Sequence, residues 1–215
     1  MKLDALYSSD LLSFEWIDQT TLLFQTLQHI RHQQYADFPS DQGHEEVEDA
    51  LEEILHILGH PMNKNAHQRY VYIGWALALA AQPTVKYYYP NDSRSDVVLS
   101  QVALWMASPF DISASADALF PEMAQETAFG GPQAADEAYQ IFYNLLKSLD
   151  SKQAYDATLD ILVDAMTGDP IIASSSKKRR LFNWLLVDVI PSAYYLRLAS
   201  AFYWKAWPFV PLGSR

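Results

Sequence analysis

The 215-residue sequence predicts a single all-α domain over residues 1–215, an irregular bundle of seven to nine helices around a central apolar helix. Apolar residues recur every three to four positions, as in helices that bury one face, and no segment alternates as a strand does before a hairpin turn. Only 7 residues are glycine, and most of them lie where a helix would begin or end. With 50% hydrophobic and 19% charged residues, the composition is typical of a folded domain.

Three helices are predicted in the first part of the chain. The first covers about 9–35. The second covers about 45–58, where one apolar stripe faces inward and the acidic residues face outward. The third, about 66–82, is apolar nearly all round and includes Trp75, so we expect it to be buried at the centre of the bundle. Pro83 is expected to end this helix, because proline lacks a backbone N–H.

A loop and two short helices are predicted next. The loop covers 83–92 and carries three consecutive tyrosines. A fourth helix follows at about 96–107, with Ser95 placed to accept a hydrogen bond as its N-cap. A fifth helix is predicted at about 115–127, and Pro121 should split it into two short pieces.

The sixth and seventh helices, about 132–149 and 151–167, are expected to form an antiparallel hairpin with a tight turn at Asp150. Pro132 suits the first turn of the sixth helix. The spacing of the apolar residues predicts that one face of this helix is buried. That face consists of Ala135, Ala138, Tyr139, Phe142, Leu145, Leu146 and Leu149.

The eighth helix should start near Lys178, kink or break at Pro191, and resume to about Lys205. Its apolar part is the nearest approach to a membrane-spanning segment, but polar residues and Pro191 interrupt it. Residues 207–215 contain two prolines and should form an extended tail.

Composition excludes several classes of chemistry. The chain has no cysteine, so disulfides, thiolate nucleophiles and cysteine-ligated metal sites are excluded. No serine lies in a nucleophile motif and no phosphate-binding loop is present, so neither a catalytic residue nor a cofactor is predicted. The start of the sequence lacks the features of an export signal, which predicts a cytoplasmic protein.

The charge of the chain is divided along the sequence. The net charge is −11, but residues 1–176 hold 25 of the 26 acidic residues and carry −17, whereas residues 177–215 carry +6. This division bears on partners rather than on the fold. The acidic body of the chain would repel nucleic acid and would attract a basic protein.

Two acidic rows are candidate partner-binding surfaces. One lies on the outward face of the second predicted helix, and the other recurs at four-residue steps along the seventh. Like charges at that spacing repel one another, so solvent, the basic run of the same chain or a basic partner should offset them. The residues are Glu45, Glu48, Glu52, Asp156, Asp160 and Asp164.

A run of four basic residues, Lys177, Lys178, Arg179 and Arg180, has three interpretations. It could dock electrostatically on the acidic body of the chain or on an acidic partner. It could hold the protein on anionic lipid together with the apolar residues that follow. It could contact nucleic acid locally.

Aromatic residues supply two further candidate surfaces. Tyr87, Tyr88 and Tyr89 lie in the predicted loop, and Trp207 and Phe209 lie in the predicted tail. Tyrosine and tryptophan often anchor protein interfaces, and packing within the chain is the alternative for both segments.

Four residues are candidate metal ligands. Glu53 and His56 form a Glu-x-x-His step on the second predicted helix, which is half of a di-iron carboxylate site, and no second such step occurs. His29 and His32 are three residues apart on the first predicted helix and could join them. The alternative is a solvated acidic face that complements the helix dipole.

The stretch from Val71 to Met106 combines an apolar helix, a Pro-x-Asp loop at Pro90–Asp92 and a second apolar helix that ends near Leu104 and Trp105. This pattern resembles helical immunity proteins of bacterial toxin systems, which are also small, acidic and poor in cysteine. The resemblance implies an inhibitor whose acidic face covers a basic toxin.

The sequence therefore predicts a non-enzymatic, acidic helical domain that binds a basic protein partner. An immunity-like inhibitor is a specific form of this prediction. A metal-dependent helical-bundle enzyme and a peripheral membrane protein are the alternatives from other classes, and homo-oligomerisation is left open.

Overall fold

The computed structural model describes residues 22–32, 44–107, 132–171 and 175–196, which form seven helices and contain no strand. The predicted all-α class is confirmed. The helices are 22–32, α2 (His44–Leu58), α3 (Lys64–Tyr88), α4 (Arg94–Ala107), α7 (Gln133–Lys147), α8 (Ala154–Thr167) and one continuous helix made of α9 (Ser175–Trp184), the π-helical segment η1 (Leu185–Val189) and α10 (Ile190–Tyr194). The predicted helix over 115–127 and the tail over 207–215 lie outside the described residues.

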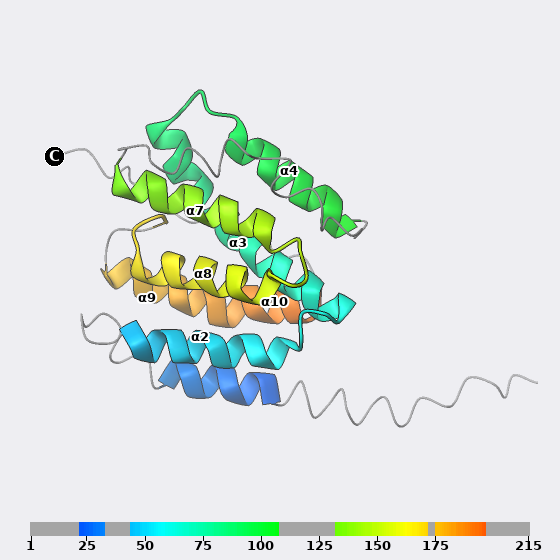
Figure 1. Ribbon diagram of the computed structural model, residues 1–215. Helices are drawn as coiled ribbons and strands as arrows, with labels where there is room; N and C mark the ends of the chain where they lie inside the picture. Colours follow the sequence, from blue (N-terminus) through cyan, green and yellow to red (C-terminus); the bar gives the residue numbers. More distant parts are fainter. Residues whose placement is uncertain (1–21, 33–43, 108–131, 172–174, 197–215) are drawn as a thin grey trace, which may run out of the picture.

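Figure 1 shows helix 22–32, α2, α8 and α7 stacked side by side, with α3 crossing behind α7 and α8 and with α4 at one end. α3 packs against α2, α4, α7, α8 and α10. α7 and α8 pack together as the predicted hairpin, although the connection over 148–153 is longer than the tight turn expected at Asp150. Within the described ranges, no helix is both long and apolar enough to cross a membrane.

The core is built from the inward faces of these helices. All seven residues predicted to form the buried face of the sixth helix are buried, as the helical periodicity indicated. Trp75 is only half-buried, contrary to the expectation that its helix is buried all round, and its indole N–H donates to the Leu99 carbonyl at 3.3 Å. The largest fully buried side chains include Tyr70, Phe142 and Phe182.

Side chains of α3 satisfy the carbonyls at the end of α2. The Tyr70 hydroxyl lies 2.8 Å from the carbonyl oxygens of both Leu55 and Gly59, and Arg69 Nη1 donates to the Leu58 carbonyl at 2.9 Å. Gly59 has a φ of 95°, a left-handed conformation that glycine adopts without strain. The sharp turn from α2 into α3 is therefore fixed by hydrogen bonds as well as by packing.

The prediction that Pro83 ends the third helix is wrong, because α3 continues through Pro83 to Tyr88. A proline inside a helix costs about 3 kcal/mol through its lost hydrogen bond and its steric clash. Thr84 and Val85 are buried immediately after it, and burial of this turn offsets that cost. Tyr87 and Tyr88 consequently lie on a helix rather than in a loop.

The start of α4 also differs from the prediction. α4 begins at Arg94, so Ser95 lies inside its first turn, where it is fully buried, and does not serve as the N-cap. Such shifts of one or two residues at helix ends are common.

The helix is not broken at Pro191, which was one form of the prediction, because it continues from Ser175 to Tyr194. The helix accommodates this proline by widening into η1, in which the Ile190 N–H donates to the Leu185 carbonyl, five residues earlier. The α-helical geometry then resumes but ends at Tyr194, and Leu196 adopts a φ of 50°. The helix therefore does not run unbroken to Lys205, which itself lies outside the described residues.

Replacing Phe142 by alanine should lower the free energy of unfolding by about 3–5 kcal/mol, because the side chain is fully buried and its removal leaves a cavity. Phe24 is a matched control, since 46% of it is exposed and its replacement by alanine should cost less than about 1 kcal/mol. Urea unfolding of both variants measures the difference, and similar losses in the two would contradict this assignment of the core.

Candidate protein-interaction surface

The two acidic rows predicted from separate parts of the sequence lie on neighbouring helices. α2 packs against α8, and Figure 1 shows the helix of α9 and α10 between them in the view. The acidic face consists of Glu48, Asp49, Glu52 and Glu53 on α2 and Asp156, Asp160 and Asp164 on α8. Five of these seven residues are exposed, while Glu52 and Asp164 are half-buried. Glu45 lies in the first turn of α2.

Tyr155 joins the two rows. Its ring lies 5.7 Å from the ring of His56 on α2 and 6.2 Å from that of Tyr70 on α3. Burial raises the pKa of the Tyr155 hydroxyl, and the negative charges of Glu52 and Asp156 raise it further. The Tyr155 hydroxyl therefore lies near one carboxylate from each helix, Glu52 on α2 and Asp156 on α8, and the two rows come together at this point.

Asp164, the member of the acidic face nearest the end of α8, is held in a more buried setting beside α7. Burial raises its pKa to about 6, with further contributions from the charges of Asp160 and Glu137. The Glu137 carboxylate on α7 accepts the Asp169 N–H at 2.6 Å and the Gln133 side-chain amide at 2.7 Å, so it is held in place. The expectation that the aspartates of α8 form an exposed row is therefore correct for Asp156 and Asp160 and wrong for Asp164.

An open groove of about 520 Å³ runs between helix 22–32 and α2 beside the acidic face. Its exposed inner surface is mostly apolar, and three carboxylates stand along it. The residues that line it are Leu22, Thr26, Asp49, Glu52, Glu53, His56 and Ile57. Leu22 is 52% exposed, which is a large apolar exposure for a side chain in a groove.

The four candidate metal ligands do not form a metal site. His29 and His32 are exposed on helix 22–32, and Glu53 and His56 are exposed on α2. Across the ranges that the structure describes, no three histidine, aspartate or glutamate side chains are grouped so that they could hold a metal ion. His56 instead lies against Tyr155.

The basic run lies in the first turns of α9, where cations oppose the helix dipole. Lys178 forms an ion pair with Asp169 at 3.1 Å and donates to the Thr167 carbonyl at 2.7 Å, so it caps the end of α8. One interpretation expected the basic run to pair with the aspartate row of α8, but Lys178 pairs with Asp169 instead. Arg179 is half-buried and Arg180 is exposed, and Lys177 lies in the same helix.

Val187 is 52% exposed, but the other five apolar residues over 181–187 face the core. They are buried, with at most 7% of each exposed, and they could not insert into lipid without unfolding the helix bundle. These residues are Leu181, Phe182, Trp184, Leu185 and Leu186. The geometry therefore gives the membrane interpretation no support.

The three tyrosines are used differently. Tyr87 is 45% exposed and packs edge-on against Tyr88, with ring centroids 5.0 Å apart. Tyr89 is half-buried and lies 5.7 Å from the ring of Tyr139 on α7. Tyr87 is thus the member of this group that a partner could reach most readily. Trp207 and Phe209 lie outside the described residues.

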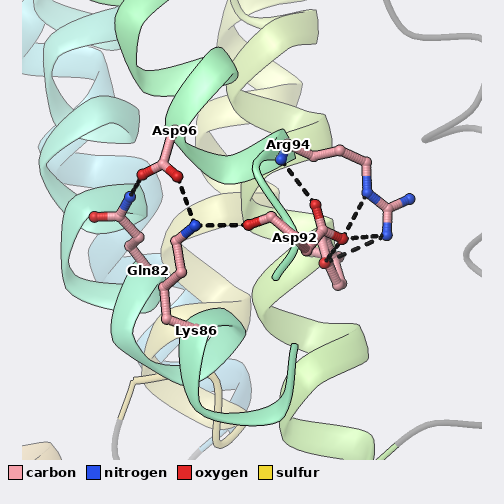
Figure 2. Close-up of polar contacts among 6 residues, drawn as sticks. Gln82, Lys86, Asp92, Arg94 and Asp96 are labelled. Carbon is pink, nitrogen blue, oxygen red and sulfur yellow. Dashed lines mark hydrogen bonds and ion pairs between the residues drawn. The ribbon is translucent and has the colours of Figure 1, made fainter. Parts of the chain in front are cut away.

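The sequence analysis did not predict a polar network that holds the connection between α3 and α4 against α7 (Figure 2). Asp92 Oδ2 accepts from Arg94 Nε at 2.8 Å and from the Tyr139 hydroxyl at 2.5 Å, and Asp92 Oδ1 accepts the Arg94 backbone N–H at 2.8 Å. Burial would raise the pKa of Asp92, but the hydrogen bonds from Arg94 and Tyr139 outweigh it and lower the pKa to about 2.

A second part of the network links α3 to the start of α4. Lys86 Nζ donates to the Asp92 carbonyl at 2.6 Å and pairs with Asp96 at 2.5 Å, and Gln82 donates to the other oxygen of Asp96 at 2.7 Å (Figure 2). These donors and acceptors satisfy one another, so the network is a structural clamp rather than an open site. The Asp-x-Arg spacing was a visible signal for its local part, whereas Tyr139 lies 47 residues away from Asp92.

No known protein family, curated protein or solved structure matches this chain. The resemblance of Val71–Met106 to immunity proteins therefore stays a prediction. The functional argument rests on the geometry and charge of the described residues.

Replacing Asp164 by asparagine should stabilise the protein by about 1 kcal/mol at pH values above about 7, with allowance for solvent screening of this half-buried group. The folded wild type keeps the Asp164 proton up to about pH 6, whereas the unfolded chain releases it near pH 3.8. Wild-type stability should therefore fall as the pH rises through this window, and the variant should lack that fall. Urea unfolding as a function of pH measures this, and a variant less stable than wild type at neutral pH would contradict it.

Replacing Asp92 by asparagine should destabilise the protein at neutral pH by about 1–3 kcal/mol, because Arg94 and Tyr139 lose a charged, part-buried acceptor. The lowered pKa of Asp92 means that its contribution is present above about pH 4 and is lost as the pH falls towards 2. Asp96→Asn is the control, since its more exposed ion pair with Lys86 should contribute less than about 1 kcal/mol. Equal losses for the two variants, measured by thermal unfolding, would mean that the clamp has been misassigned.

Proposed function

We propose that this chain is a protein-interaction domain whose acidic face binds a basic segment of a partner protein in the cytoplasm. The observation that carries the proposal is the joining of two acidic rows, from α2 and α8, around Tyr155. A continuous negative surface attracts a cationic partner from a distance and raises its association rate.

The energetics of the acidic face support the same function. Burial raises the pKa of Asp164, and the charges of Asp160 and Glu137 raise it further, so this end of the face carries repulsion between carboxylates. The nearby cation Lys178 is engaged at the end of α8 and does not neutralise the row. Lysine and arginine side chains of a partner would relieve this repulsion. An immunity-like inhibitor that covers a basic toxin surface is one form of this function.

Two triple variants with the same net charge test the proposal. The acidic-face variant carries Glu48→Gln, Glu52→Gln and Glu53→Gln. The control variant carries Ser100→Lys, Gln101→Lys and Leu104→Lys on the exposed surface of α4. Both raise the charge of the chain equally, and both should leave the melting temperature nearly unchanged because most of the substituted side chains are exposed.

Affinity capture from cells of the native host, with quantitative mass spectrometry, measures the outcome. Wild type and the α4 control should retain the same basic protein at an ionic strength of about 0.15 M, and the acidic-face variant should retain about tenfold less. High salt should release the partner from all three. Equal retention by the acidic-face variant and the control would show that the acidic face does not bind the partner.

A further inference from the structure

We infer that the groove between helix 22–32 and α2 receives a basic amphipathic helix of the partner. The apolar side of that helix would lie against Leu22 and Ile57, and its lysine or arginine side chains would pair with Asp49 and the neighbouring glutamates. This inference rests on the proposed function and assigns its binding site and the chemical class of its partner.

The groove is wide and open, and its α2 side offers a line of contacts along which a helix could lie. The α2 residues that line it stand at positions 49, 52, 53, 56 and 57, which form one stripe along the helix. This stripe extends over about 12 Å, or roughly two helical turns. Leu22 and Thr26 are one turn apart on the facing helix. Two packed helices with a groove between them accept a third helix through the same ridge-and-groove packing that joins the first two.

The chemistry of the lining defines the occupant. The floor is mostly apolar and Leu22 is exposed, so side chains such as leucine would gain by burial there. Asp49, Glu52 and Glu53 stand along one side, and the described residues that line the groove include no lysine or arginine. A helix with apolar residues on one side and basic residues beside them matches both properties. A second copy of this chain, with its net charge of −11, or an anionic lipid surface would bring like charges together.

A synthetic peptide pair tests the inference on the full chain by fluorescence anisotropy. The first peptide, of about 18 residues, places leucine along one helical face and lysine elsewhere, with alanine between them. The second has the same composition in an order that spreads leucine around the helix. Both peptides carry the same charge, so their difference in affinity reports the apolar groove rather than general electrostatic attraction.

Two matched protein variants locate the binding site. Glu53→Lys changes a carboxylate inside the groove, and Asp160→Lys makes the same change on the acidic face outside it. Leu22→Asn removes the exposed apolar contact. Because Leu22 is exposed, this variant should fold as the wild type does. Circular dichroism verifies that each variant is folded.

The amphipathic peptide should bind wild type about tenfold more tightly than the scrambled peptide. Glu53→Lys should weaken its binding about tenfold, Leu22→Asn about threefold, and Asp160→Lys less than about threefold.

Several results would overturn the inference. Equal affinity for the two peptides, or equal effects of Glu53→Lys and Asp160→Lys, would show that the acidic face binds cations without the groove, and the proposed function would stand. Failure of both peptides to bind even at low salt would contradict the proposed function as well. A wild-type dimer in sedimentation that Glu53→Lys dissociates would make a second copy the occupant. Tighter peptide binding after Arg197→Glu and Lys205→Glu would make the chain's own C-terminal segment the occupant.

Discussion

The close contact of α3 with the α7–α8 hairpin is the constraint on which the arrangement of this domain depends. A Cβ atom on Gly74, in the middle of α3, would lie 3.0 Å from Ile161 Cδ1 and 3.2 Å from Leu145 Cδ1, so the ends of these two side chains would have to shift by a few tenths of an ångström to admit it. The contact directs the apolar face of α8 inward. Because α2 then packs against α8, the aspartates of α8 are left on the outer surface beside the glutamates of α2. The acidic face is thus a consequence of how the core packs.

The same packing explains why several cations do not neutralise this face. Arg69 donates to the Leu58 carbonyl and lies over the ring of Tyr194, Lys178 binds the Thr167 carbonyl, and Lys86 binds the Asp92 carbonyl. The first two cations satisfy carbonyls at the C-terminal ends of α2 and α8, where the helix dipole favours positive charge, and Lys86 satisfies a carbonyl of the α3–α4 connection. These three side chains therefore stabilise the fold by binding backbone oxygens, and they do not neutralise the acidic face.

Sequence reasoning succeeded where a single helix carries the signal. The stripes of the helices over 44–58 and 133–147 were predicted because amphipathic periodicity is a property of one segment. It failed at Pro83, where burial of the neighbouring turn outweighs the local preference of proline to end a helix, and the break considered at Pro191 is absent as well. It also missed the hydrogen bond between Asp92 and Tyr139, because partners 47 residues apart have no spacing rule that would connect them.

The acidic face, too, could be predicted from the sequence only in part. Each acidic row was visible in the sequence. That the two rows meet depends on the packing of α2 against α8. The charges of Glu52 and Asp156 both raise the pKa of the Tyr155 hydroxyl, which lies where they meet. Separate rows on opposite sides of a bundle would each be screened by solvent. Rows on one side reinforce each other's field, and at Asp164 burial raises the pKa, with further contributions from Asp160 and from Glu137 on α7. A cationic ligand on this side gains the attraction of both rows at once, which an isolated acidic helix could not provide.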